Sequence, residues 1–386
     1  MTIKRQKALW AKEALRGGVG AVREPPLLRG IAVLTGGGDA PGLNAVIRSV
    51  TRTAILQEGW QVLGIRHGFE GLLGGDEGIM PLDWDRVSGL LSRGGTILGA
   101  ASHSKKLLFT KNEEGEVVVS DEAKERIRER MEELQIDALV IIGGDGTMAI
   151  GQQLFEAGVR LVGVPKTIDN DLPGTEFTFG FDSALDMATD ALDRLHTTAE
   201  SHDRVMILEV MGRNSGWIAL HSGIAGSADV ILIPEIPFSI PKVCQKIEAR
   251  RQRGRHFSMV VVAEGARPAD GQQMYIDYRE ERVLGGIGHW VGQEIAKYGG
   301  VQTRTVVLGH LQRGGSPSAF DRILATQFGA SAVRLIRKGK FGYMTSLQGG
   351  DIVSIQIKDI VGEQKKVPVD GKLVQTALGL GISFGA

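Results

Sequence analysis

The sequence is poor in cysteine, in long apolar runs and in net charge. Its one cysteine, Cys244, excludes an internal disulfide and a cysteine-based metal cluster and favours a reducing compartment. No uninterrupted apolar stretch approaches the roughly 20 residues of a membrane-spanning helix. The 45 basic residues are balanced by 45 acidic ones, so no global field favours nucleic acid or an anionic membrane as a partner. These absences predict a soluble, cytoplasmic protein.

Glycine, in contrast, is abundant. The chain has 54 glycines among 386 residues, about twice the usual share of roughly 7%, which is consistent with many tight turns at strand ends. A chain of this length exceeds what one hydrophobic core usually organises, so we expect two domains. Short apolar runs alternate with helical patterns along most of the chain, which predicts a predominantly parallel α/β architecture. One of these patterns, residues 120–134, is typical of an exposed helix capped by Ser120 or Asp121.

The most informative stretch is a predicted βαβ unit. Residues 138–142 and 161–164 have the length and β-branched content of buried parallel strands, and residues 148–157 fit a crossover helix. The first strand is followed by G-G-D-G-T, residues 143–147, at the start of that helix. Backbone N–H groups there can approach a phosphate closely, and the helix dipole favours its charge. A plain strand-to-helix turn is the alternative.

The second strand of this unit leads into K-T-I-D-N-D, residues 166–171. If the extended backbone favoured before Pro165 continues, Thr167, Asp169 and Asp171 alternate onto one side. Two carboxylates and a hydroxyl facing a phosphate cradle suggest phosphoryl transfer, with one acid to hold Mg²⁺ and another to accept a proton. A self-capping acidic turn is the alternative. Two such motifs on consecutive strand ends favour the functional interpretation.

Further polar motifs follow other predicted strands. The run T-G-G-G-D-A-P-G-L-N, residues 35–44, opens a helix and is another candidate phosphate cradle, although it is neither G-x-G-x-x-G nor a P-loop. Arg213 follows the strand predicted over 205–210, and a surface salt bridge is its alternative role. Glu264 follows the strand predicted over 258–263 and could simply cap a turn. A cluster of Arg304, His310 and Arg313 is by itself weak evidence for anion binding.

These motifs together resemble the phosphofructokinase family, which carries TSGGDAPGMN, GGDG[ST], P-x-T-[IV]-D-N-D and R-x-x-x-L-G-H-x-Q-R-G-G-x-P at the matching places. The resemblance covers about residues 31–345 through at least six motifs in family order. It implies a fold of two Rossmann-like three-layer α/β domains with mostly parallel sheets. Residues 30–168 plus about 286–335 would bind the donor, and residues 169–285 plus about 336–386 the sugar phosphate. Residues 1–29 would be an extension.

The resemblance also implies a reaction and a role for each site residue. A phosphoryl group would pass to the 1-hydroxyl of fructose 6-phosphate, with Asp169 as general base, Asp171 and Arg213 assisting, and Asp145 holding Mg²⁺. The donor would lie against Gly38, Gly144, Asp145, Gly146, Thr147 and Lys166. The sugar phosphate would be held by Thr167, Asp169, Asp171, Met211, Gly212, Arg213, Glu264, His310 and Arg313, with Arg204 and Arg304 arriving from a neighbouring subunit.

A site shared between subunits implies a homo-oligomer, and bacterial family members suggest a tetramer. In those members, arginines that match Arg48 and Arg52 bind the phosphates of an allosteric effector. Solvated arginines are the alternative for this pair.

Two positions indicate different phosphoryl donors. In the resembling family Gly146 goes with ATP, because an aspartate there crowds the α-phosphate, whereas a lysine at position 166 is typical of pyrophosphate users. The family arginine that neutralises the transferring phosphate falls at Ser102, so His103, Lys105 or Lys106 would have to replace it. Glycine leaves room for ATP and lysine does not exclude it. We therefore expect ATP, with pyrophosphate as the alternative.

Overall fold

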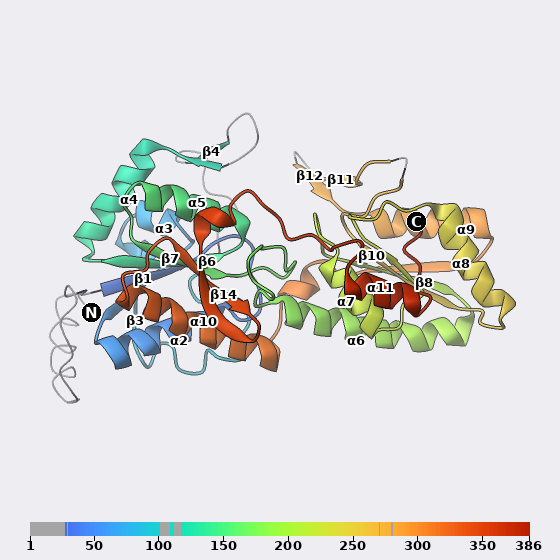
Figure 1. The fold of residues 1–386 in the computed structure, drawn as a ribbon, viewed down its shortest axis with the longest axis horizontal. Coiled ribbons are helices and arrows are strands. Elements are labelled where there is room, and N and C mark those ends of the chain that lie inside the picture. Colours follow the sequence, from blue (N-terminus) through green and yellow to red (C-terminus); the bar gives the residue numbers. More distant parts are fainter. Residues whose placement is uncertain (1–27, 29, 101–108, 112–116, 270, 279–280) are drawn as a thin grey trace.

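A computed structural model describes residues 28, 30–100, 109–111, 117–269, 271–278 and 281–386. The chain forms two units, each built on its own sheet, which lie side by side along the long axis of the molecule (Figure 1). Nearly all of the predicted extension over residues 1–29 falls outside the described residues, and so do Ser102, His103, Lys105 and Lys106. None of the described helices combines the length and the apolar character that crossing a bilayer would require.

The first unit contains a seven-stranded sheet in the order β15-β14-β7-β6-β1-β2-β3. Its strands are β1 (Gly30–Thr35), β2 (Gln61–Ile65), β3 (Ile79–Leu82), β6 (Ala138–Gly143), β7 (Leu161–Pro165), β14 (Tyr343–Gln348) and β15 (Asp351–Gln356). The inner pairs are parallel, and only the edge strands β3 and β15 run antiparallel to their neighbours. The direction of winding reverses between β1 and β6, which is the switch point where open α/β sheets bind ligands.

Helices cover both faces of this sheet. One face packs against α2 (Leu43–Thr53), which continues as a π-helical turn over Ala54–Glu58, and α10 (Ala319–Arg337). The other face packs against α3 (Glu70–Leu73), α4 (Asp121–Glu133) and α5 (Asp145–Glu156). Residues 31–34 of strand β1 are all apolar because both faces of the sheet are buried there. Ile31 and Val33 pack in the core on one face, whereas Ala32 and Leu34 pack in the core on the other.

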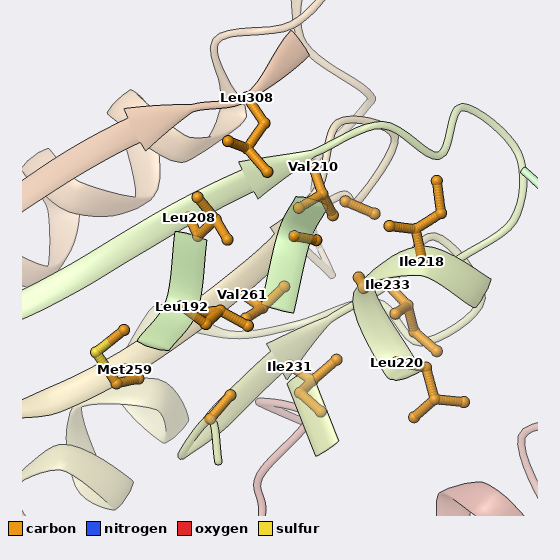
Figure 2. Packing of buried hydrophobic residues seen from close by; sticks show 14 of the residues in the cluster. Leu192, Leu208, Val210, Ile218, Leu220, Ile231, Ile233, Met259, Val261 and Leu308 are labelled. Carbon is orange, nitrogen blue, oxygen red and sulfur yellow. The ribbon is translucent and has the colours of Figure 1, made fainter. Parts of the chain in front are cut away.

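The second unit has a four-stranded, fully parallel sheet in the order β13-β8-β10-β9. Its strands are β8 (Val205–Val210), β9 (Val230–Leu232), β10 (Ser258–Ala263) and β13 (Thr303–Val307). Helices α6 (Phe181–His202), α7 (Trp217–Ala225) and α11 (Lys372–Gly379) cover one face, and α8 (Ile240–Gln252) and α9 (Ile287–Gly299) cover the other. Figure 2 shows Leu208 and Val261 of this sheet beside Leu192 of α6.

Two small hairpins extend from the units. They are β4 (Phe109–Lys111) with β5 (Val117–Val119), and β11 (Tyr275–Tyr278) with β12 (Glu281–Leu284). Short 3₁₀ turns at Asp76–Gly78, Gly309–Arg313 and Ile357–Asp359 complete the described secondary structure.

The two three-layer units with mostly parallel sheets confirm the predicted fold class. The C-terminal part of the chain is divided differently from the prediction, however. Helix α9 and strand β13 join the second sheet, whereas β14 and β15 join the first. Of the segment 286–335, only α10 packs on the first sheet, where it contacts β7 and β14 as well as α2. The motifs gave the order of the strands along the chain but carried no information on which sheet each strand would pair with.

The close contact of α2 and α10 depends on Gly329. A Cβ atom at this position would lie 2.8 Å from Ser49 Cβ and 2.9 Å from the Val46 carbonyl oxygen. We expect Gly329→Ala to lower the free energy of unfolding by about 1–3 kcal/mol, because two helices must move apart. Gly379→Ala is the matched control, since nothing lies within 4 Å of its Cβ position. Urea denaturation of both variants tests this; equal stabilities would contradict the packing argument.

Candidate active site

Two glycine-rich loops meet at the switch point of the first sheet. They follow β1 and β6, and Thr147 at the start of α5 lies between them. A Cβ atom at Gly143 would lie 2.2 Å from Thr147 Oγ1, and one at Gly36 would lie 2.5 Å from the same atom. Only glycine fits at these two positions. In contrast, nothing lies within 4 Å of the Cβ position of Gly146, so the loop after β6 has open space beside its backbone.

Two cations converge on the loop after β1. Lys166, at the end of β7, is 3% exposed, and its Nζ donates a hydrogen bond to the Gly38 carbonyl oxygen. Arg313, on the 3₁₀ turn that follows β13, donates from Nη1 to the Asp39 carbonyl oxygen at 3.2 Å. Burial, together with the nearby charge of Arg313, lowers the pKa of Lys166 to about 8. Each unit therefore contributes one cation beside the loop after β1, an arrangement of charge that suits an anion.

The acidic residues lie in the loop after β7. Asn170 has a φ of 50°, so the predicted extended run from Thr167 to Asp171 is interrupted, and the alternation argument is wrong at this residue. The carboxylates are nevertheless close enough to interact. Burial and the charge of Asp171 raise the pKa of Asp169 to about 7, and the same two causes raise the pKa of Asp145. The charge of Asp171, in the loop after β7, therefore acts on Asp145 in the loop after β6.

Asp169 has the features of a general base. Its Oδ1 atom is buried and has no hydrogen-bond partner among the described residues. Its backbone is fixed from both sides, because its N–H donates to Thr167 Oγ1 at 3.1 Å and its carbonyl oxygen accepts from Ser215 Oγ at 3.2 Å. A raised pKa means that the carboxylate binds a proton readily, while an oxygen without a partner can accept one from a substrate.

The loops of the second sheet face this acid. The loop after β8 is fixed by Gln312, whose buried Oε1 accepts from Met211 N–H at 2.7 Å. Arg213 follows, and its charge lowers the pKa of Asp169, against the larger effect of burial. Burial raises the pKa of Glu264, which follows β10, and Arg213 opposes this rise. Arg213 and Glu264 therefore lie within electrostatic reach of each other, and both act on Asp169.

The structure brings together most of the predicted site residues. The loops at the carboxyl ends of β1, β6, β7, β8, β10 and β13 contain Gly38, Gly144, Asp145, Gly146, Thr147, Lys166, Thr167, Asp169, Asp171, Met211, Gly212, Arg213, Glu264, His310 and Arg313. Arg204 and Arg304 are the exceptions. Arg204 precedes β8, whereas Met211 follows that six-residue strand, so about 20 Å of strand separates Arg204 from the site of its own chain.

Several functional positions carried no clear signal in the sequence. Gln312 fixes the loop after β8, and Gln273 Nε2 donates to the Arg213 carbonyl oxygen at 3.0 Å. Gln312 stands between His310 and Arg313 in sequence, which could have indicated it.

The two arginines predicted as an effector site lie on α2. The guanidinium of Arg52 lies 3.8 Å from the centroid of the Trp84 ring, so this arginine is stacked on a neighbour. Burial, together with the nearby charge of Arg52, lowers the pKa of Arg48.

Asp145 and Asp171 suit a magnesium ion that is bound partly by water and substrate better than a metal ion that is held entirely by protein side chains. Within the described residues, no group of three or more histidine, cysteine, aspartate or glutamate side chains is placed to hold a metal. Mg²⁺ usually keeps several waters and is bound by one or two carboxylates together with substrate phosphates. Asp145 and Asp171, which interact across two neighbouring loops beside the glycine cradle, meet that requirement.

Comparison with known proteins agrees with this geometry. The family model for phosphofructokinase matches residues 30–336. The chain is 54% identical over 355 residues to an ATP-dependent 6-phosphofructokinase from Chloroflexus aurantiacus, covering 92% of this chain and 97% of that protein. It is also 48% identical over 342 residues to a pyrophosphate–fructose 6-phosphate 1-phosphotransferase from Amycolatopsis methanolica, covering 88% and 96%. The phosphofructokinase structure from Pichia pastoris is similar, with a TM-score of 0.73 and 34% identity, over 89% of this chain and 38% of that one.

Proposed function

Because the chain belongs to the phosphofructokinase family, we propose that it transfers a phosphoryl group from ATP to the 1-hydroxyl of fructose 6-phosphate. The observation that carries this proposal is Asp169. The buried Oδ1 atom of this half-buried acid has no hydrogen-bond partner among the described residues, and the acid lies between a glycine-lined anion cradle and the loops of a second sheet. The product would be fructose 1,6-bisphosphate, which is consistent with a role in glycolysis.

The transfer would proceed by direct displacement. Asp169 accepts the proton of the 1-hydroxyl as the hydroxyl oxygen forms a bond to the terminal phosphorus of ATP, and the bond from that phosphorus to the bridging oxygen breaks to release ADP. Lys166 and Arg313 face the negative charge on the phosphates. Asp145, with Asp171 beside it, would hold Mg²⁺, which supplies charge neutralisation on the donor phosphates. Little covalent chemistry is required of the protein, so positioning and electrostatics provide most of the catalysis.

The sugar phosphate would bind in the loops of the second sheet. Arg213 and Glu264 would contact the sugar. His310 and Arg313 would face the phosphate that the sugar already carries, since an arginine fork can donate two hydrogen bonds to one phosphate. Thr167, Met211 and Gly212 would complete the contacts within one subunit.

A neighbouring subunit would supply Arg204 and Arg304. Arg204 precedes β8 and Arg304 is the second residue of β13, so both lie toward the amino ends of their strands, whereas the other site residues follow the carboxyl ends. The edge strand β13, on which Arg304 lies, also exposes Val306 and Val307, and Leu311 is exposed on the turn that follows. We therefore propose a homo-oligomer, a tetramer by family resemblance, with sites shared between subunits. Regulation through Arg48 and Arg52 and a location in the cytoplasm stay predictions.

Observations favour both donors, with more support for ATP. The open space beside Gly146 admits a nucleotide, and the relative at 54% identity is named as ATP-dependent. In favour of pyrophosphate, Lys166 lies in the cradle and the Amycolatopsis relative is named for that donor. The lysine amine is bound to the Gly38 carbonyl oxygen, so it does not occupy the space beside Gly146.

Donor identity is tested with fructose 6-phosphate and Mg²⁺, comparing ATP with pyrophosphate in an assay for fructose 1,6-bisphosphate. We expect turnover with ATP. We also expect Gly146→Asp to lose at least about 100-fold in kcat/KM for ATP, because the carboxylate repels and crowds the α-phosphate, whereas the control Gly146→Ala should retain activity. Both variants should fold, since the Cβ position is free. Turnover with pyrophosphate alone would overturn the choice of ATP.

The role of Asp169 is tested by Asp169→Asn, which keeps the shape of the side chain but cannot accept the proton. We expect kcat to fall by about 10²- to 10⁴-fold, while the Kd for fructose 6-phosphate, measured by calorimetry, changes by less than about threefold. Asp190→Asn, which removes an exposed carboxylate that pairs with Arg194 on α6, is the control and should leave kcat unchanged. Near-normal turnover of Asp169→Asn would remove the proposed base.

A further inference from the structure

The C-terminal strap, residues 362–371, connects the two units. It leaves the first unit after β15 and the 3₁₀ turn at Ile357–Asp359, and it ends at α11 on the second sheet (Figure 1). On its way it passes the catalytic loop, residues 169–176, which carries Asp169 and Asp171. Neither the motifs nor the proposed mechanism uses any residue of this strap, although Lys365 on it is bound directly to the catalytic loop.

The side chain of Lys365 is bound to three oxygens of the catalytic loop. Its Nζ donates to Asn170 Oδ1 at 2.8 Å, to the Thr175 carbonyl oxygen at 2.9 Å and to the Glu176 carbonyl oxygen at 3.0 Å. An ammonium group has three donors, and here all three are directed at one loop. The main-chain N–H of Lys365 also donates to the Asp171 carbonyl oxygen at 2.8 Å.

The strap is in turn fixed to the second unit. The carbonyl oxygen of Lys365 accepts from Trp217 Nε1 at 2.8 Å. Two residues further on, Val367 N–H donates to Glu235 Oε1 at 2.8 Å, and the same carboxylate accepts from Gly216 N–H at 3.1 Å. Gly216 and Trp217 directly follow the loop of Arg213. The strap therefore joins the loop that holds the general base to the loop proposed to bind the sugar.

The backbone of the catalytic loop takes a left-handed turn at Asn170. This residue has a φ of 50°, a conformation that asparagine adopts more readily than most other side-chain-bearing residues. Asn170 Oδ1 accepts from Thr178 N–H at 3.1 Å as well as from Lys365. Because Asn170 stands between Asp169 and Asp171, its backbone conformation sets the direction of both carboxylates.

We propose that Lys365 is a positioning residue, which holds the catalytic loop in the conformation that presents Asp169 to the acceptor hydroxyl and Asp171 to the donor side. The proposal rests on the proposed function. Burying an ammonium group is unfavourable unless it is paired and hydrogen-bonded, and burial lowers the pKa of Lys365 to about 8 while Asp171 and Glu176 oppose this change. The three hydrogen bonds to the catalytic loop, together with the nearby charges of Asp171 and Glu176, meet that requirement where the strap crosses the loop.

The experiment compares Lys365→Met with Lys366→Met in the full-length enzyme. Methionine keeps the apolar stem of lysine and removes the ammonium, and Lys366 is the exposed neighbour on the same strap. We expect Lys365→Met to lower kcat at least tenfold, with KM for fructose 6-phosphate changed less than threefold, because the carboxylates are misdirected while the sugar-binding groups of the other loops remain. Lys366→Met should keep both parameters within twofold.

A second variant separates positioning from a loss of folding. Lys365→Cys can be alkylated with 2-bromoethylamine, which restores an ammonium at nearly the length of lysine; treated wild type controls for reaction at Cys244. Recovery of at least fivefold in kcat is expected. A kcat of Lys365→Met within twofold of wild type, or a lost kcat that alkylation does not restore, would overturn the proposal. If wild type itself fails to phosphorylate fructose 6-phosphate, the proposed function fails instead.

Discussion

The site depends on the interaction of partly buried charges at the boundary between the two units. Asp171 acts on both Asp169 and Asp145, while Arg313 acts on Asp169 and on Lys166. Away from water such charges interact more strongly than at an exposed surface. The acids come from the first unit and Arg313 from the second, so neither unit contains the complete cluster. The geometry that makes Asp169 a base is therefore a property of the assembled chain.

The fold explains why these charges meet. In a parallel sheet the carboxyl ends of all strands lie at one edge, and the edge loops of the two sheets face each other here. Arg313 reaches the Asp39 carbonyl oxygen, and Ser215 reaches the Asp169 carbonyl oxygen across this boundary. The C-terminal strap adds a further connection through Lys365. These links between the units hold the base close to the groups that would bind its substrates.

The sequence predicted local features well and long-range ones poorly. The strands at 205–210 and 258–263 were placed at their observed bounds, because continuous apolar runs identify buried parallel strands. Of the two predicted caps of α4, Ser120 and Asp121, the structure confirms Ser120, whose Oγ accepts from Ala123 N–H. The sheets to which β13, β14 and β15 belong were not predicted, because the pairing of a strand depends on strands that are distant in the sequence. Likewise, the hydrogen bonds of Lys365 to the catalytic loop join segments about 195 residues apart, which no local pattern contains.

The most direct test of the charge coupling is the pH dependence of kcat/KM for fructose 6-phosphate in wild type and in Asp171→Asn. Asp169 must be ionised to accept a proton, and burial together with Asp171 raises its pKa to about 7, so wild-type activity should fall as the pH drops below about 7. Removal of the Asp171 charge takes away one cause of the raised pKa. The acid limb of the variant should therefore move to lower pH, whatever its absolute rate. An acid limb at the same pH in both proteins would contradict the account.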